Sequence, residues 1–263
     1  MAFFFKSQPA AGVSWVANAY WFFLSVFGLV LFSWLGWQGM RYQQFHFDFL
    51  YDAMAIADHI AQYGPQNRHF LGFEQLTKIQ HVELFNGIAS AIHQQGHGLT
   101  ELTFSSSYGV QPLLTQAEVV HLTDVALLIT GFNQVVFCCA VLSVLLLSAP
   151  LLWVKSGPLV TRLPVFNPFG LLCLYAGVGF SILLGVVFVG PKAVFYWLHE
   201  VVFPAQHQWF FYYQDSLMTT LMKAPDLFGM ITLGLLGYIA VITLVCTYGI
   251  RSLLAKVKHS YCP

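Results

Sequence analysis

Two histidines and one aspartate lie in apolar sequence where ionisable side chains are rare. His121 and Asp124 belong to the run VVHLTDV, and His199 belongs to YWLHEVVF. Ionisable groups at membrane depth cost free energy, so they are expected to serve a function. A histidine exchanges protons near neutral pH, and a neighbouring carboxylate can orient its ring. The three residues therefore predict acid–base chemistry, and we assign them as catalytic candidates.

The helix that must carry His121 and Asp124 is predicted to begin after Thr115. Thr115 and Glu118 have the spacing of a capping box, in which each side chain satisfies a backbone amide at the helix start. Apolar sequence then continues to about residue 150. At 1.5 Å per residue, His121 would lie roughly 7–8 Å below the helix start, with Asp124 one turn deeper on the same face. Asp124 is expected to orient His121, or alternatively to join helices through a polar contact.

The composition of the chain is that of a membrane protein. Of its 263 residues, 57% are hydrophobic and 8% are charged, whereas a soluble domain carries about 25% charged residues. The five cysteines show neither a disulfide pattern nor a metal-ligand pattern, and no metal site is expected. We predict an all-α polytopic membrane protein with four transmembrane helices, at about 13–37, 117–149, 169–189 and 229–250.

Two longer segments connect the predicted spans. Residues 38–115 are expected to form a mostly helical extracytoplasmic cap, with two helical stretches followed by an extended piece and a turn. Residues 191–228 are too polar to span a membrane and too aromatic for a solvated loop, so we expect an interfacial segment. We interpret 1–263 as one membrane domain that carries both segments.

The charge distribution predicts the orientation of the chain in a bacterial cytoplasmic membrane. With four spans, both termini and the loop near 150–168 share one side, which carries six bases and no acid. All eleven acids and the other five bases fall on the opposite side. Because basic residues concentrate on the cytoplasmic side, both termini are predicted to be cytoplasmic. His121 and His199 then lie at the extracytoplasmic face.

The segment that leaves the third span supplies further candidates. His207 lies between glutamines in a predicted turn, and we expect it to be an ordinary surface residue. The histidines of 38–115 show no close ligand spacing and are expected to be solvated. The aromatic run at 209–213 is typical of an interfacial belt, and such a belt can also wall an acyl groove. Four residues of the two converging segments are assigned to substrate binding: Glu118, Trp209, Phe211 and Asp215.

Several classes of enzyme are excluded by the motifs that the chain lacks. The sequence has no glycine-rich nucleotide loop, no GxSxG serine elbow and no HExxH metalloprotease motif. No cysteine falls on the predicted outer side, which excludes a cysteine nucleophile there. The chemistry that remains is acid–base catalysis by histidine and carboxylate groups at the boundary between lipid and water.

Two blocks of the sequence resemble the family of integral membrane proteins related to the lipoprotein intramolecular transacylase. The family's His-x-x-Asp-Val element, at the outer start of its second span, reads His121-Leu122-Thr123-Asp124-Val125 here. The family's pattern after the third span is matched in order by His199, Phe203-Pro204, Trp209-Phe210-Phe211, Asp215-Ser216-Leu217-Met218 and Pro225-Asp226-Leu227-Phe228. The resemblance covers about 115–230. It departs at Ala126, where the family usually has lysine, and the outer loop matches only loosely.

The resemblance implies an acyl shift on a diacylglyceryl-modified lipoprotein. The acyl chain at the sn-2 position moves to the α-amine of the N-terminal cysteine, which leaves an N-acylated lyso-form lipoprotein. His121 and His199 would be the catalytic pair, one as base toward the amine and the other as donor or acid toward the ester, with the assignment open. Neither a cofactor nor a nucleic-acid partner is expected; the partners are the lipoprotein and membrane lipids, and the oligomeric state is not indicated.

Two other interpretations stay open. In the first, His121 and His199 ligate a haem or form part of a quinone site, because membrane bundles can bring histidines from two helices onto one cofactor. In the second, the protein is a non-catalytic lipid-binding scaffold, and both histidines tolerate alanine.

Overall fold

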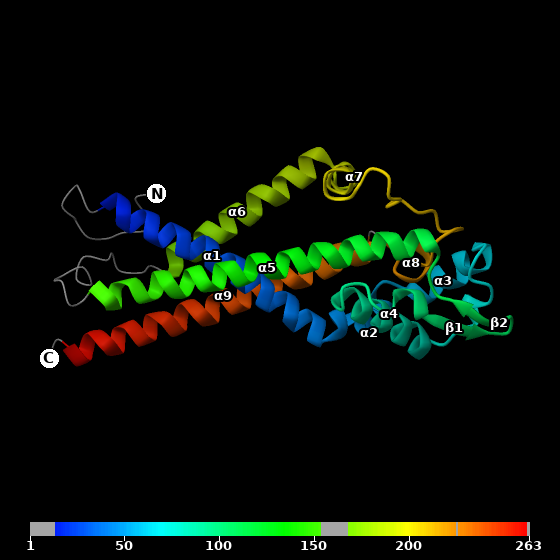
Figure 1. Ribbon diagram of the computed structural model, residues 1–263, viewed down its shortest axis with the longest axis horizontal. Helices are drawn as coiled ribbons and strands as arrows, with labels where there is room; N and C mark the ends of the chain where they lie inside the picture. Colours follow the sequence, from blue (N-terminus) through cyan, green and yellow to red (C-terminus); the bar gives the residue numbers. More distant parts are fainter. Residues whose placement is uncertain (1–13, 154–167, 225, 262–263) are drawn as a thin grey trace. The chain divides into compact units, whose positions relative to one another are not determined.

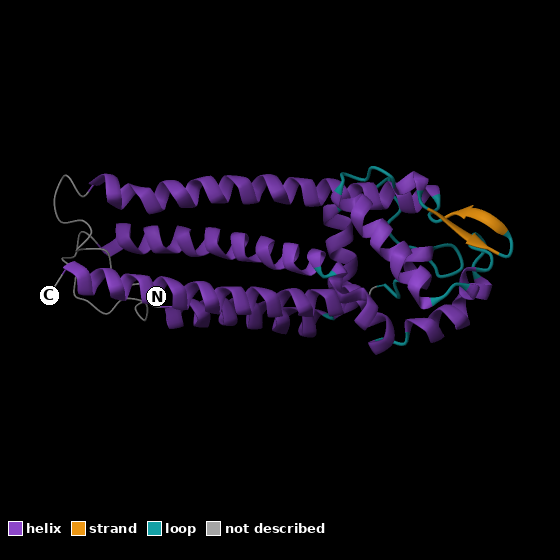
Figure 2. Ribbon diagram, turned by 90° about the horizontal axis from the view of Figure 1, so that it is seen from below, coloured by secondary structure: helices purple, strands orange, loops and turns teal. Residues whose placement is uncertain are grey.

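The computed structural model describes residues 14–153, 168–224 and 226–261. Most of the described chain is helical (Figure 2). Three of the six bases that set the predicted orientation, Lys6, Lys155 and Arg162, lie outside it, and so does Pro225 of the family-like pattern. The elements in chain order are α1 (Ser14–Tyr42), η2 (Gln44–His46), α2 (Phe47–Ala53), α3 (Ile56–Tyr63), η3 (Gly64–Gln66), η4 (Phe73–Gln75), α4 (Lys78–His93), η5 (Leu99–Glu101), β1 (Thr103–Ser106), β2 (Gly109–Pro112), α5 (Gln116–Trp153), α6 (Pro168–Val189), α7 (Pro191–Val202), α8 (Leu217–Leu221) and α9 (Asp226–Tyr261).

The predicted class, an all-α polytopic membrane protein, is confirmed. Among the described residues, three segments are long and apolar enough to cross a membrane, namely Ala19–Tyr42, Gln116–Ser148 and Asp226–Gly249. A fourth span results if α6 and α7 are counted as one broken span. Gly190, at that break, has φ +93°, a conformation that side-chain-bearing residues rarely adopt. Pro191 follows it and cannot donate a backbone hydrogen bond, so the α6 ladder ends here.

The chain divides into two compact units. Unit 1 comprises residues 1–37, 134–191 and 236–263, and unit 2 comprises residues 38–133 and 192–235. The described surface of unit 1 is largely apolar, as expected where lipid rather than water is the solvent. Strongly exposed examples are Val144, Phe188 and Val245.

Unit 2 contains the cap, in which α2, α3, α4 and the β1–β2 hairpin gather (Figure 1). The helical stretches, the extended piece and the turn occur in the predicted order. Phe47 and Phe73 are almost fully buried, and the Phe47 ring stacks on Phe85 with centroids 3.8 Å apart. The antiparallel hairpin runs from the pair Thr103↔Pro112 to the pair Ser106↔Gly109.

One cap histidine corrects a sequence prediction. His81 was expected to be solvated, but it is 2% exposed. Its Nε2–H donates to the Phe73 carbonyl at 3.1 Å, and its Nδ1 accepts from the Tyr51 hydroxyl at 2.9 Å. Burial lowers the pKa of His81, and the bond to the Phe73 carbonyl opposes that shift in part. The prediction failed because both partners come from elements separate from α4.

Candidate active site

The start of α5 is the first part of the candidate site, and the predicted capping box is present there. Thr115 donates to Glu118 Oε2 from its backbone amide at 2.8 Å and from its hydroxyl at 2.9 Å. The Glu118 amide donates back to the Thr115 hydroxyl oxygen at 3.4 Å. These bonds satisfy amides that a helix start otherwise leaves without partners.

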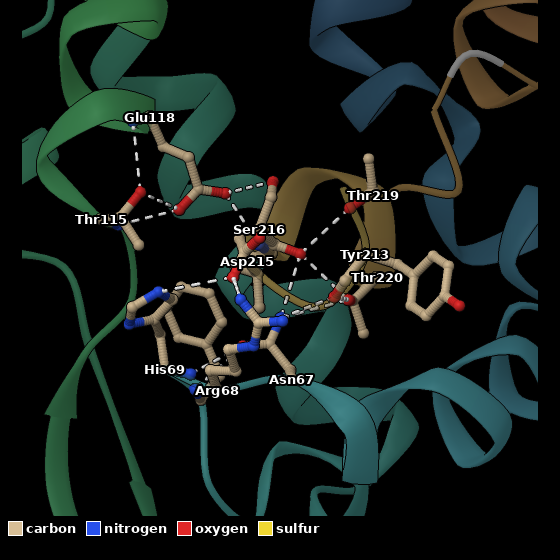
Figure 3. Close-up of polar contacts among 12 residues, drawn as sticks. Asn67, Arg68, His69, Thr115, Glu118, Tyr213, Asp215, Ser216, Thr219 and Thr220 are labelled. Atoms are coloured by element: carbon tan, nitrogen blue, oxygen red, sulfur yellow. Dashed lines mark hydrogen bonds and ion pairs between the residues drawn. The ribbon is translucent and has the colours of Figure 1, made fainter. Parts of the chain in front are cut away.

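Glu118 has a second set of partners that the sequence did not indicate. Its Oε1 accepts from the Ser216 hydroxyl at 2.6 Å and from the backbone amides of Leu217 and Met218 at 2.7 and 3.1 Å. The residue is 0% exposed, and Figure 3 shows its carboxylate between Thr115 and Ser216. The carboxylate therefore joins the start of α5 to the start of α8. Its predicted contact with substrate stays a prediction.

Asn67 secures the chain just before α8 and was missed in the sequence. Its amide nitrogen donates to the carbonyls of Tyr213 and Ser216, at 3.0 and 3.3 Å, and Figure 3 places it among these groups. Its carbonyl oxygen accepts from the amides of His69 and Phe70. The second pair is a local turn typical of asparagine, which was the only available signal. The contacts with 213–216 are tertiary.

Asp215 lies beside this network in an exposed ion pair. Its Oδ1 is 3.1 Å from Arg68 Nη1, with the two side chains 36% and 69% exposed. Pairs this exposed contribute little to stability, about 0–1 kcal/mol. Contact between Asp215 and substrate also stays a prediction.

His121 and His199 come together in unit 2. Their ring centroids are 6.1 Å apart, and their planes differ by 28°. Phe203 lies against both rings, with centroids 4.8 Å from His121 and 5.2 Å from His199. Phe211 lies 6.0 Å from His121, and Trp209 lies 4.9 Å from His199. Two imidazoles thus share an aromatic enclosure, which includes both aromatic residues predicted to bind substrate.

The two rings differ in their hydrogen bonds. His199 Nδ1 lies 2.7 Å from the Phe195 carbonyl, one turn earlier on α7. A carbonyl only accepts, so Nδ1 carries the proton and the lone pair of the neutral ring is on Nε2. His121 is 8% exposed, and its Nδ1 is buried without a hydrogen-bond partner. A buried polar atom without a partner is rare and requires an explanation.

Asp124 corrects the predicted arrangement of the site. It does not hydrogen-bond His121; instead its Oδ2 accepts from His207 Nδ1 at 2.6 Å. The two side chains are 13% and 33% exposed, so His207 is not the ordinary surface residue that was expected. The prediction assumed that Asp124 would hydrogen-bond His121, its neighbour one turn away on the same helix. The imidazole of His121 turns into the aromatic enclosure instead, and a loop residue 83 positions away in sequence occupies Asp124.

Within the described ranges, no group of three or more histidine, cysteine, aspartate or glutamate side chains is arranged to hold a metal ion. The site brings together two imidazoles and a histidine–aspartate pair, which can transfer protons. Aromatic rings surround the two imidazoles, and in such a largely apolar setting a hydrogen bond to a substrate is stronger than in water.

No protein-family model matches the sequence, and no curated protein matches it. Solved structures do. The membrane-integral lipoprotein intramolecular transacylase Lit from Bacillus cereus, in a variant with one histidine replaced by arginine, aligns with a TM-score of 0.63 at 14% identity, covering 94% of this chain and 96% of that one. A variant with that histidine replaced by alanine gives 0.62, with 94% and 97% covered. A third Lit structure gives 0.59, with 94% and 99% covered, and both comparisons are again at 14% identity. The chain therefore has the Lit fold along nearly its whole length.

Proposed function

We propose that this protein is a membrane acyltransferase of the lipoprotein intramolecular transacylase family. It moves the sn-2 acyl chain of a lipoprotein's diacylglyceryl group to the α-amine of the N-terminal cysteine. The observation that carries the proposal is the His121–His199 pair, whose centroids lie 6.1 Å apart in an aromatic enclosure. The fold shared with Lit over 94% of the chain supports it.

The reaction needs proton transfers that two imidazoles can provide. The α-ammonium group, with a pKa of about 8, loses a proton, and its nitrogen then attacks the ester carbonyl carbon. The bond between that carbon and the sn-2 oxygen breaks, and the leaving oxygen takes a proton. The nitrogen gives up a second proton as the amide forms, so one proton is released overall. Because both reacting groups belong to one substrate, proximity supplies much of the rate acceleration.

We assign the base role to His199. The Phe195 carbonyl holds its proton on Nδ1 at 2.7 Å, which leaves Nε2 as acceptor for the amine proton and keeps the ring oriented as it becomes charged. His121 then acts toward the ester as hydrogen-bond donor and as acid for the leaving oxygen. No activated donor or cofactor is required, because an ester is converted to a more stable amide.

The charge distribution and the location of lipoprotein lipids both support a site at the extracytoplasmic face. Arg251, Lys256 and Lys258 follow the membrane segment of α9 in the sequence, and basic residues favour the cytoplasmic side. In this orientation unit 2 lies at the outer face of a bacterial cytoplasmic membrane, where lipoproteins carry their lipids. Trp209 and Phe211 then wall the acyl chain.

Mass spectrometry of lipoprotein N-termini tests the proposal. Purified protein is incubated with diacylglyceryl lipoprotein, and the lyso product is compared for the wild type, His121→Ala and His199→Ala. General acid–base groups contribute about 10²- to 10⁴-fold in rate, so each variant should lose at least about a hundredfold. The matched control is His97→Ala, which alters an exposed histidine of unit 2 and should keep full activity.

Two results would overturn the proposal. One is lyso product at the wild-type rate from both histidine variants. The other is a Soret band or a bound quinone in the purified protein that disappears in either variant, because this would make the histidines a cofactor site.

A further inference from the structure

Residues 207–216 form a segment that is attached to α5 at both ends. At one end His207 donates to Asp124 at 2.6 Å. At the other end Ser216 donates to Glu118, also at 2.6 Å. On α5 the two carboxylates lie three residues before and three residues after His121, and this spacing places all three side chains on one face of a helix. The segment, which we call the strap, therefore crosses over His121.

We propose that His207 is a positioning residue for the acyl-shift reaction. Its bond to Asp124 holds the strap over the two histidines and so shapes the wall against which a long acyl chain binds. The substrate in this inference rests on the proposed function. The attachment of the strap and its position over the histidines rest on the contacts described below.

The contacts of the strap explain what the bond positions. Trp209 lies against His199 and Phe211 lies against His121, so the strap gives each imidazole one aromatic neighbour. A short turn, closed by the His207 amide donating to the Pro204 carbonyl at 2.9 Å, leads from Phe203 into the strap. Releasing His207 would free the strap between this turn and Tyr213, whose carbonyl accepts from Asn67.

The two attachments differ in strength. Glu118 is 0% exposed and accepts at Oε1 from three donors of the α8 start. The His207–Asp124 pair is a single bond between side chains that are 33% and 13% exposed. Water competes for a partly exposed bond but not for a fully buried one. The strap therefore opens at its His207 end.

Opening is required by the state of His121. Its Nδ1 is buried and has no hydrogen-bond partner, so a substrate reaches this nitrogen only when its cover moves. Phe203 and Phe211, both next to or within the strap, contact the ring. An acyl chain offers the same apolar surface as these side chains and can replace them against the ring.

Hydrogen–deuterium exchange tests the attachment without using the reaction. A hydrogen bond that involves a charged group shifts an opening equilibrium by about 10- to 100-fold. Amide exchange over 203–212 should therefore be at least about tenfold faster in His207→Ala and in Asp124→Ala. His97→Ala should match the wild type. Unchanged exchange over 203–212 in both strap variants would overturn the proposal.

Asp124→Asn separates positioning from a role of the carboxylate charge. An asparagine oxygen still accepts from His207, so this variant should exchange and turn over much closer to wild type than Asp124→Ala. In addition, the double variant His207→Ala with Asp124→Ala should be no worse than either single variant, because one bond is lost in each case. Equal damage from Asp124→Asn and Asp124→Ala, or additive losses in the double variant, would contradict the positioning role.

Steady-state kinetics distinguishes positioning from partial unfolding. Loss of the acyl wall weakens the ground state and the transition state alike, so His207→Ala should raise KM about tenfold and leave kcat within about threefold. Partial unfolding would lower kcat at constant KM, and that result would overturn the proposal. If the proposed function itself is wrong, His121→Ala will retain activity. The faster exchange of the strap variants will still be observed in that case, so the two failures can be told apart.

Discussion

The cap core and the candidate active site each bury one histidine among aromatic rings. In the cap, His81 is 2% exposed, and its ring centroid lies 4.7 Å from that of Phe73. In the site, His121 is 8% exposed, and its centroid lies 4.8 Å from that of Phe203. Burial and aromatic surroundings therefore do not separate the two residues.

Their hydrogen bonds do. Both ring nitrogens of His81 have partners, Tyr51 and the Phe73 carbonyl. Nδ1 of His121 has none. A buried polar atom without a partner destabilises the fold by about 1–3 kcal/mol. The two bonded nitrogens of His81 fit a role in the fold, whereas the free Nδ1 of His121 fits the substrate role that we propose for it.

The largest expected effect on stability is at Glu118, which resembles His81 in being buried with all its bonds made. Glu118→Ala leaves donors of Thr115 and of the α8 start without an acceptor. It should lower the free energy of unfolding by about 3–5 kcal/mol, measured by thermal unfolding in detergent. Glu118→Gln keeps the shape and one acceptor oxygen, so its free energy of unfolding should lie between those of the wild type and Glu118→Ala. If Glu118→Ala has wild-type stability but no activity, Glu118 serves the reaction rather than the fold.

The next effect compares the same substitution at the two histidines. Both His81→Ala and His121→Ala leave a cavity, but only the first also leaves the Tyr51 hydroxyl and the Phe73 carbonyl without partners. His81→Ala should therefore be the more destabilising variant by about 2 kcal/mol. Activity should show the reverse order, with His81→Ala active below its melting temperature and His121→Ala inactive. Equal melting temperatures of His81→Ala and His121→Ala would contradict the structural role assigned to His81.

The smallest effect is a pH dependence that originates in the cap. Burial lowers the pKa of His81 below its ordinary value of about 6.5 in the folded protein. As pH falls below about 6.5, the unfolded chain takes up a proton that the folded chain does not, so stability is lost by at most about 1.4 kcal/mol per pH unit. Stability stops falling once the pH is below the pKa of His81 in the folded protein. Above about pH 6.5 this histidine causes no loss of stability.

Thermal unfolding between pH 7.5 and pH 5 in wild type and His81→Asn measures this dependence. The pKa of His93 is also lowered by burial, and it contributes equally to both proteins. The wild type should therefore lose more stability on acidification than the variant. Identical slopes would show that His81 is not the group responsible.

What the sequence predicted depends on local patterns. The membrane class follows from long apolar runs, and the capping box joins residues three apart, so both are readable from spacing. The site was predicted only in part. Apolar surroundings single out the two histidines in the sequence, but the His207–Asp124 bond spans 83 residues and the second set of Glu118 bonds spans 98 to 100. No periodic pattern encodes such contacts. The burial of His81 is hidden from the sequence for the same reason, because Tyr51 and Phe73 belong to neighbouring elements of the cap.

The position of Glu118 in the chain also has a consequence for biosynthesis. Its α8 partners are made 98 to 100 residues later. At about 5–20 residues per second, a ribosome needs on the order of 5–20 s to add them. During that interval the cap is already synthesised, while Glu118 and His121 lack the segment that completes their surroundings. Assembly of the site is thus a late event in the synthesis of the chain, after both halves of unit 2 have emerged.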